Sequence, residues 1–334
     1  MKPLRIVYLL DDTHLAGGIR VAVAQADALI ARGHEVVLAT RGEPLTWRGS
    51  RAEWHFVSGW DEIDPAGFDF VIGTFWKTIQ HAYALAGDRT VHLCQGYEGS
   101  FTVYQPFVAE IEAAYRIPIP KLTVSPHLVE ICRRFHHDAT WIGQIVDDPF
   151  YQPPVRRPRA RRVLLVGPAQ ADFKGIDVGY SAVRQARARG AELDLIRVSQ
   201  WPAADGEPTE LAGEFHIGLD TREMVRLIAS CDLFLGPSRQ QEGFGLPAAE
   251  SMAAGLPAVL SAIPSFLSFD PAHDYALFAP EDDAAALGRA LVQLLGDAPL
   301  RARLGDRGKE VVEQFRAERT GERLEQWFLS RRKP

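Results

Sequence analysis

One short segment constrains the fold of this chain more than any other. The run Cys231-Asp-Leu-Phe-Leu is apolar and is followed by a Gly-Pro pair, which predicts a buried strand. Gly243 and Gly245 then allow the backbone to approach a ligand closely. A helix is expected to begin near Leu246, because the proline after it is tolerated in a first helical turn. The free N–H groups of a helix that follows a strand and a Gly-rich turn in this way suit a diphosphate.

Two glutamates flank this turn at an E-x7-E spacing. Glu242 precedes the turn, and Glu250 lies about one turn into the expected helix. From there its carboxylate can accept hydrogen bonds from hydroxyl groups of the ligand whose phosphates face the helix. The combination favours a sugar-nucleotide site. The alternative is an ordinary strand–helix joint that carries two surface glutamates.

The segment resembles the donor-site signature of the retaining GT-B glycosyltransferases of family 4, P-S-x-x-E-G-F-G-L-P-x-x-E-A-M-A-x-G-x-P-V. The resemblance implies that Glu242 lies beside the donor sugar and that Glu250 binds the ribose hydroxyls. It also implies that a backbone stretch holds sugar and phosphate, formed by Gly243, Phe244, Gly245 and Leu246. One departure is visible, because three residues separate Ser238 from Glu242 where the usual pattern has two.

A second motif is expected to open another strand–loop–helix unit, Val163-Leu-Leu-Val-Gly167 with Lys174-Gly175 after it. It resembles the family run V-G-R-x(n)-K-G, whose arginine and lysine neutralise the donor diphosphate. Lys174 matches, and a solvent-exposed lysine is the alternative. Pro168 stands in place of the arginine. Either Lys174 and backbone amides suffice, or another cation, Arg239 or Arg197, takes that place.

The N-terminal part of the chain carries a Gly-Gly pair between an expected strand and an expected helix. Gly17 and Gly18 can turn backbone N–H groups toward the leaving diphosphate or the acceptor, as the family resemblance implies, although a simple tight turn explains them equally well. His14 lies in the same loop and is a weaker candidate for an acceptor contact, since a loop histidine is more often solvent-facing.

A further strand end carries Gln95-Gly-Tyr97-Glu98. Many relatives have a histidine beside the reacting sugar here, and Gln95 occupies that place. The run resembles one found in rhamnosyl-transferring relatives, which points toward a deoxyhexose donor. His92 is expected inside the strand as a satisfied core histidine. Glu242, Lys174 and Gln95 are thus the predicted catalytic residues, and Trp76 with Lys77 is a candidate lining of the acceptor site.

Alternation of strands and helices occurs twice, which predicts two doubly wound, Rossmann-like α/β domains that face each other across a cleft, the GT-B fold. A Pro- and Arg-rich stretch, 147–162, is expected to be the linker. We therefore expect an acceptor-side domain over 1–150, joined by a C-terminal helix at about 315–334, and a donor domain over 160–314. The C-terminal helix is expected to break near Thr320-Gly321.

Composition limits the other possibilities. With a formal net charge of −6, the chain lacks the broad basic surface of a nucleic-acid binder. Three scattered cysteines indicate reduced thiols and a cytoplasmic location. No apolar run approaches the length of a membrane span and no signal peptide is recognisable, so membrane contact is expected to be peripheral at most. Acidic pairs occur, but none has the spacing of a divalent-cation site, so neither metal nor cofactor is expected.

The sequence therefore predicts a metal-independent retaining glycosyltransferase that uses a nucleotide-sugar donor and a small-molecule, glycan or lipid-linked acceptor. A sugar-nucleotide epimerase of the same fold and a non-catalytic nucleotide-binding protein are the alternatives. A Rossmann dehydrogenase is disfavoured, because the glycine pair does not fit the spacing G-x-G-x-x-G.

Overall fold

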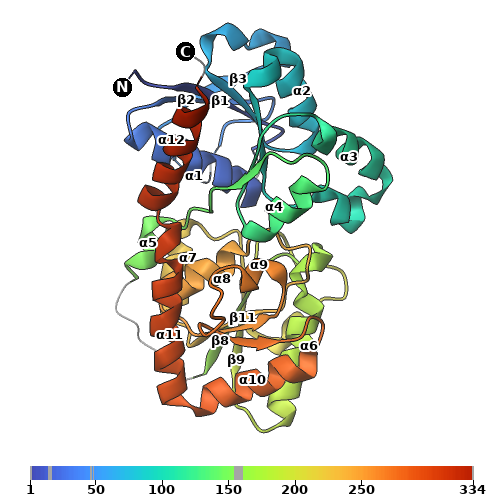
Figure 1. The fold of residues 1–334 in the computed structure, drawn as a ribbon. Helices are drawn as coiled ribbons and strands as arrows, with labels where there is room; N and C mark the ends of the chain where they lie inside the picture. Colours follow the sequence, from blue (N-terminus) through green and yellow to red (C-terminus); the bar gives the residue numbers. More distant parts are fainter. Residues whose placement is uncertain (1, 14–16, 46, 48, 154–160, 333–334) are drawn as a thin grey trace. The chain divides into compact units, whose positions relative to one another are not determined.

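A computed structural model describes residues 2–13, 17–45, 47, 49–153 and 161–332. The chain divides into two compact units (Figure 1). Unit 1 comprises Met1–Ile145 and Phe315–Pro334, and unit 2 comprises Val146–Gln314. The boundary lies close to the expected residue 150.

Unit 1 is built on a seven-stranded parallel sheet in the order β3-β2-β1-β4-β5-β6-β7. Its strands are β1 Arg5–Leu10, β2 Glu35–Thr40, β3 Glu53–Phe56, β4 Phe70–Gly73, β5 Thr90–Cys94, β6 Lys121–Thr123 and β7 Ala139–Trp141. Its α-helices are α1 Gly17–Ala31, α2 Trp76–Ala86, α3 Val108–Arg116, α4 Pro126–Arg133 and α12 Ala317–Arg331. The strand order reverses between β1 and β4, so the loops that follow these strands diverge there.

Unit 2 holds a six-stranded parallel sheet in the order β10-β9-β8-β11-β12-β13. Its strands are β8 Arg162–Val166, β9 Asp194–Ser199, β10 Ala212–Ile217, β11 Leu233–Gly236, β12 Ala258–Ser261 and β13 Leu277–Ala279. Its α-helices are α5 Asp148–Tyr151, α6 Ile176–Ala188, α7 Thr221–Ala229, α8 Leu246–Ala253, α9 Pro264–Leu267, α10 Ala284–Gly296 and α11 Ala298–Val312. Here the order reverses between β8 and β11, the two strands that precede the predicted motifs.

The hydrophobic pattern of each strand explains why both sheets are covered by helices. The inner strands β1, β2 and β11 are nearly continuous apolar runs, as parallel strands buried on both faces require. In unit 2, Val163, Leu165 and Leu233 form one apolar core with residues of the flanking helices. The predicted class, two doubly wound Rossmann-like domains of the GT-B type, is confirmed at the level of each unit.

The C-terminal helix completes unit 1 although it is remote in sequence. Helix α12 lies beside α1 (Figure 1). A Cβ atom on Gly321 would lie 3.2 Å from Cβ of Ala28, so the glycine permits this close packing. The Phe328 ring packs on Phe70 of β4 at a centroid distance of 4.9 Å. The predicted break at Thr320-Gly321 is wrong: the interruption comes earlier, at the short 3-10 helix Glu313–Phe315.

The expected linker also contains regular structure. Residues 148–151 form α5, whose Asp148-Pro149 start suits a first helical turn. Arg162 begins β8 and is paired with Glu214, at 2.6 Å from Nη1 to Oε1. Residues 154–160, which carry most of the arginine cluster, lie outside the described part of the chain, as does His14. Within the described part, no helix combines the length and hydropathy that a membrane span requires.

Candidate functional site

The candidate donor site in unit 2 centres on an ion pair between the two predicted motifs. Nζ of Lys174 lies 2.7 Å from Oε2 of Glu242, and the two side chains are 17% and 8% exposed. Ser238 Oγ donates to the same carboxylate oxygen at 3.1 Å. Lys174 ends the 3-10 helix after β8, and Glu242 lies in the loop after β11. A solvent-exposed Lys174, the alternative expected from sequence, is therefore wrong.

Gly175 brings these two loops together. Its φ of 60° is left-handed, and a Cβ atom there would lie 2.1 Å from the carbonyl oxygen of Pro237. No other residue type combines that backbone conformation with that approach. The loops after β8 and β11 thus touch where the strand order reverses, which is the place where doubly wound sheets bind ligands.

Gly245 fixes the start of the predicted phosphate-binding helix. It is the N-cap of α8, with a left-handed φ of 91°, and a Cβ atom on it would lie 2.3 Å from Cε1 of Phe266. No side chain caps α8, and Pro247 lies in its first turn. The N–H groups of Ala248 and Ala249 donate to the Gly245 carbonyl at 3.0 and 3.2 Å, so the N–H of Leu246 is left in this turn for a ligand oxygen.

A small cavity joins these elements. It is lined by residues of β8, of β11 and of the loops after them, by the start of α8 and by Phe266 of α9, namely Val166, Lys174, Phe234, Gly236, Pro237, Ser238, Glu242, Gly245, Pro247, Ala248 and Phe266. The structure thus brings Lys174, Glu242 and Gly245 together, as the sequence predicted.

The other predicted donor-site residues lie outside this lining. Glu250 lies in α8 and is 2% exposed. The Phe244 ring packs on Phe269 at a centroid distance of 5.0 Å, so its side chain serves the core. Gly243 is buried, and Leu246 is the first residue of α8. Ribose binding by Glu250 and backbone contacts by the glycine turn stay predictions.

The two arginines considered as substitutes for the family arginine have other partners. Arg197 is fully buried, and its Nε donates to Glu207 at 2.9 Å. Arg239 bridges two carboxylates, Asp177 at 2.9 Å and Asp282 at 2.8 Å. The expectation that Arg197 reaches a ligand is wrong, because burial and its ion pair hold it in the core. Arg239 would have to leave both carboxylates first.

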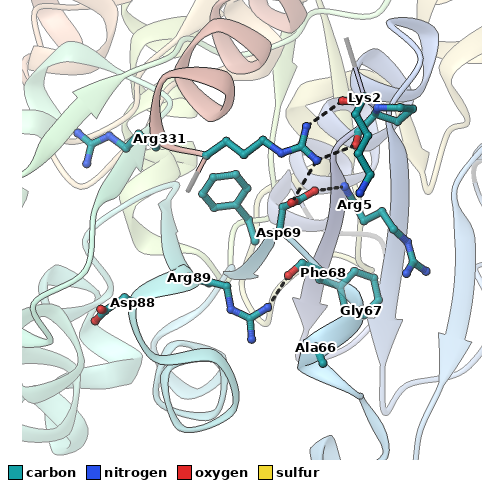
Figure 2. Close-up of a pocket in the computed structure, with 12 residues that line it drawn as sticks. Lys2, Arg5, Ala66, Gly67, Phe68, Asp69, Asp88, Arg89 and Arg331 are labelled. Carbon is teal, nitrogen blue, oxygen red and sulfur yellow. Dashed lines mark hydrogen bonds and ion pairs between the residues drawn. The ribbon is translucent and has the colours of Figure 1, made fainter. Parts of the chain in front are cut away.

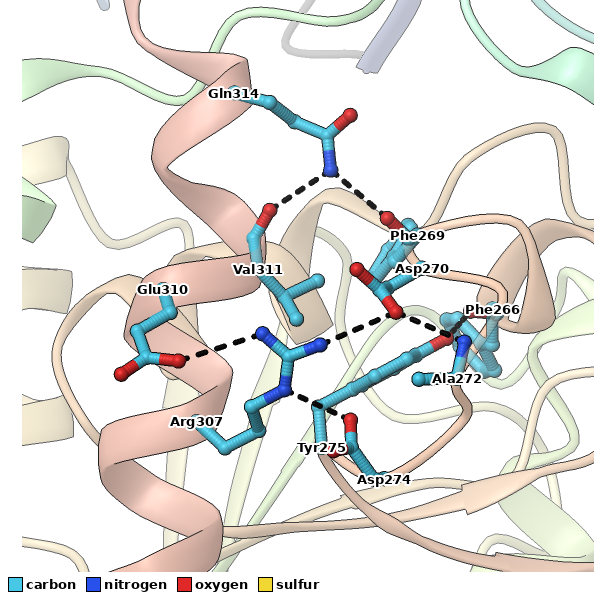
Figure 3. A network of polar contacts seen from close by, with 10 residues as sticks. All are labelled: Phe266, Phe269, Asp270, Ala272, Asp274, Tyr275, Arg307, Glu310, Val311 and Gln314. Atoms are coloured by element: carbon cyan, nitrogen blue, oxygen red, sulfur yellow. Dashed lines mark hydrogen bonds and ion pairs between the residues drawn. The ribbon is translucent and has the colours of Figure 1, made fainter.

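Phe266, which sequence reasoning missed, is held by a polar network on the neighbouring loop (Figure 3). Tyr275 Oη donates to the Phe266 carbonyl at 2.5 Å. Arg307 of α11 is ion-paired with Asp274 at 2.8 Å and with Asp270 at 3.2 Å, so the loop between α9 and β13 is tied to α11. No local signal in the sequence marks Phe266, since it reaches the Gly245 turn only through tertiary contact.

In unit 1 the structure brings Gln95 and Gly18 together. Gln95 directly follows β5, and a Cβ atom on Gly18 would lie 3.4 Å from Oε1 of Gln95. Nε2 of Gln95 donates to the Thr74 carbonyl at 3.4 Å, whereas Oε1 is buried without a hydrogen-bond partner among the described residues. A buried unpaired amide oxygen at a strand end is costly unless a ligand pairs it. Gly17 lies beside Gly18 in α1.

His92 also differs from the expectation drawn from the sequence. His92 is buried inside β5, but both ring nitrogens lack hydrogen-bond partners among the described residues, so the expectation of a satisfied core histidine is wrong. Burial, and secondarily Lys121, lower its pKa well below the ordinary value, which keeps the ring neutral. Trp76 is buried, with Lys77 Nζ above its ring at 5.4 Å. A role of this pair toward an acceptor stays a prediction.

A larger cavity, of about 400 Å³, lies elsewhere in unit 1 (Figure 2). It is formed at the N-terminal ends of β1, β4 and β5, whereas doubly wound sheets bind ligands beyond the carboxyl ends. Its arginines serve packing: Arg332 Nη1 donates to the Lys2 carbonyl at 2.9 Å, and Arg89 Nη1 donates to the Phe68 carbonyl at 2.6 Å. We therefore place the donor site at the smaller cavity in unit 2.

The described residues offer neither a metal-binding cluster nor a disulfide. Among them, no three side chains of His, Cys, Asp or Glu gather into a metal-binding group. Cys94, Cys132 and Cys231 are buried, and none of them forms a disulfide. Catalysis without a metal or cofactor stays a prediction.

Two doubly wound sheets in one chain, with a Gly-rich helix start at the switch point of the second, define the GT-B class of fold. Residues 160–297 match the family model described as glycosyl transferases group 1. Solved structures agree on the fold. HepE of Anabaena in complex with UDP-glucose is 13% identical and has a TM-score of 0.78, with 98% of this chain and 100% of that chain covered. Sucrose-phosphate synthase of Thermosynechococcus elongatus is 18% identical, with a TM-score of 0.77 and 98% of each chain covered.

Curated relatives are mannosyltransferases by name. The MMP alpha-(1->4)-mannosyltransferase of Mycolicibacterium hassiacum is 32% identical over 183 residues, which span 51% of this chain and 43% of the relative. A phosphatidyl-myo-inositol mannosyltransferase of Propionibacterium freudenreichii is 29% identical over 256 residues, or 70% of this chain and 64% of the relative. The match thus spans less than two thirds of either relative.

Proposed function

We propose that the protein is a retaining glycosyltransferase that moves a hexose from a nucleoside-diphosphate sugar to an acceptor hydroxyl without a metal ion. The observation that carries the proposal is the Lys174–Glu242 pair beside the uncapped start of α8, at the switch point of the unit 2 sheet. A cation and the positive end of a helix at one place match a diphosphate, and the neighbouring carboxylate matches a sugar hydroxyl.

In the proposed reaction, the bond from the sugar C1 to the diphosphate oxygen breaks, and a bond from C1 to the acceptor oxygen forms on the same face. The acceptor proton passes to the leaving diphosphate, so no protein nucleophile takes part. Lys174, the Leu246 N–H and the positive end of α8 stabilise the charge that develops on the diphosphate, which is electrostatic catalysis by a preorganised site. Gln95, by the family resemblance, is proposed beside the reacting sugar, and Glu250 is proposed to bind ribose.

The relatives' names make mannose the first donor sugar to test, and the Gln95-Gly-Tyr97-Glu98 run adds a deoxyhexose. The acceptor is proposed to be a small molecule, a glycan or a lipid-linked group. Three buried cysteines that form no disulfide support a cytoplasmic location.

Donor binding is tested first by thermal unfolding with UDP, GDP, dTDP, ADP and NAD, each in large excess. A ligand at about 100 times its dissociation constant stabilises a protein by roughly 2.7 kcal/mol, a shift of a few degrees. We expect a shift with a nucleoside diphosphate and none with NAD. An equal shift in the variant Lys174→Met would contradict the phosphate role of Lys174. The absence of a shift with every diphosphate would refute the proposal.

Turnover separates the two enzyme classes. Incubation of the matching nucleotide sugar with an acceptor library is followed by mass spectrometry, which detects the added hexose. An isomerised donor in the absence of any acceptor would identify an epimerase instead.

A further inference from the structure

Glu98 is a buried carboxyl group whose described partners are all neutral. It follows β5 within the Gln95-Gly-Tyr97-Glu98 run and is 8% exposed. Its Oε2 accepts a hydrogen bond from Tyr115 Oη of α3 at 2.6 Å, and the backbone N–H of Trp76, the first residue of α2, donates to the same carboxyl group. Among the described residues, no lysine, arginine or histidine is ion-paired with it.

Burial of an unpaired carboxylate is costly, so the site favours the protonated acid. Burial raises the pKa of Glu98 to about 7, against an ordinary 4.5, while the hydrogen bonds from Tyr115 and the backbone oppose the shift. Both forms of the acid are therefore accessible near neutral pH.

The Tyr115 hydroxyl group connects Glu98 to the peptide that follows Gln95. Tyr115 Oη lies 2.6 Å from Oε2 of Glu98, 2.8 Å from the Gly96 carbonyl oxygen and 3.5 Å from Sγ of Cys94. A phenol has a single proton to donate. It can therefore serve Glu98 or Gly96, but not both.

The protonation state of Glu98 decides which of them it serves. When Glu98 is ionised, it needs the Tyr115 proton, and among the described residues the Gly96 carbonyl then keeps only the hydrogen bond from Cys94 Sγ at 3.5 Å. When Glu98 is a neutral acid, its own O–H donates to Tyr115 Oη, which frees the Tyr115 proton for Gly96. Only when Glu98 is neutral can both hydrogen bonds form, the one between Glu98 and Tyr115 and the one from Tyr115 to the Gly96 carbonyl.

We propose that Glu98, as a neutral acid, is a positioning residue for Gln95, because it leaves the Tyr115 proton to anchor the Gly96 carbonyl. Among the described residues, the Gln95 side chain has one hydrogen bond, to the Thr74 carbonyl at 3.4 Å, so the anchored Gly96 peptide next to it helps to fix where its amide lies. The inference rests on the proposed function, in which Gln95 lies beside the reacting sugar.

The other titratable groups that face Glu98 do not change protonation in the pH range in which Glu98 does. They are Cys94 of β5, Tyr97 of its own loop, Tyr104 of the segment Thr102–Phe107 and Tyr115 of α3. The pKa of each of these groups is raised, chiefly by burial for the three tyrosines and by the contact with Cys132 for Cys94. Asp11 and Asp12 lie near Tyr104 and add negative charge, which also favours the neutral acid.

The test is the pH profile of sugar transfer from about pH 5.5 to about pH 8.5 in four proteins. Wild type should lose kcat/KM several-fold as the pH rises through the Glu98 pKa. Glu98→Gln keeps the acid's hydrogen-bond pattern, since its amide donates to Tyr115 and its carbonyl accepts from Trp76, and should stay at the low-pH rate throughout. Tyr115→Phe should be slow at every pH. Glu130→Gln, an exposed glutamate of α4, should keep the wild-type profile.

Two outcomes would overturn the inference: a Glu98→Gln profile that declines with that of wild type, or a Glu98→Gln rate as low as that of Tyr115→Phe. A second readout does not depend on catalysis. The amide signal of Tyr97, whose peptide group contains the Gly96 carbonyl, should shift in NMR together with the Glu98 carboxyl titration, and should stay fixed in Glu98→Gln. A static Tyr97 signal during that titration would refute the anchor even if the protein transferred no sugar, whereas loss of transfer in every protein would refute the proposed function alone.

Discussion

Nζ of Lys174 lies 2.7 Å from Oε2 of Glu242, and this pair links the loops after β8 and β11 in the candidate donor site. A bound diphosphate would compete with Glu242 for the lysine. Glu242 would keep the hydrogen bond from Ser238 Oγ at 3.1 Å, so its carboxylate would not be left without a partner. The lysine can therefore turn to phosphate while Glu242 becomes free to accept from a sugar hydroxyl.

Lys174→Met should destabilise the protein by about 1–3 kcal/mol, because Glu242 is left buried without its counter-ion. Urea unfolding measures this loss. The double variant Lys174→Met/Glu242→Gln should recover most of the stability, since no unpaired charge remains, but should not regain the thermal shift with a nucleoside diphosphate. Equal stability of the single and double variants would show that the pair contributes nothing to folding.

Gly245→Ala should destabilise by more than the roughly 1–2 kcal/mol that a left-handed backbone alone costs a non-glycine residue. The added Cβ atom would lie 2.3 Å from the Phe266 ring. Gly190→Ala is the matched control, because Gly190 has a φ of 84° with nothing within 4 Å of the added Cβ. The difference between the two free energies of unfolding measures the Phe266 contact, and a difference near zero would mean that the ring yields freely.

Much of this site follows from local sequence. The helix start at Leu246 was predicted because the glycine turn and Pro247 are local signals, and the strand that holds His92 and ends before Gln95 was predicted because a short apolar run forms it. The ion pair of Arg197 with Glu207 was not predicted, because Glu207 lies on a loop whose path the sequence does not indicate.

The other features that the sequence did not predict depend on contacts between elements that are distant along the chain. Phe266 lies against Gly245, and Tyr115 lies against Glu98, yet neither pair shares a motif. The break before α12 was misplaced because Gly321 was taken as a helix breaker. It is in fact the small residue that allows α12 to pack on Ala28.

The raised pKa of Glu98 predicts that the free energy of unfolding falls as the pH rises. Its pKa in the folded state, about 7, lies above the ordinary 4.5, so the folded protein holds a proton that the unfolded chain releases between these values. Stability from this group is fully present below about pH 4.5 and is lost as the pH rises through about 7, by an amount on the order of 1–3 kcal/mol. Urea unfolding of wild type and Glu98→Gln over this window should show the slope in wild type alone. Parallel slopes would contradict it.

Helix α12 should be required for the stability of unit 1, although unit 2 separates it in the sequence from the rest of that unit. The Phe328 ring is fully buried against Phe70 of β4, so Phe328→Ala removes a large core side chain and should cost about 3–5 kcal/mol. Gln326→Ala, on the exposed face of the same helix, should change the free energy of unfolding by less than about 0.5 kcal/mol. Hydrogen exchange after Phe328→Ala should accelerate in β4 and α1, the elements that α12 covers, before it does so in β8 and β11. A uniform loss of protection in both units would mean that they unfold together, and unchanged exchange in β4 would mean that α12 is dispensable.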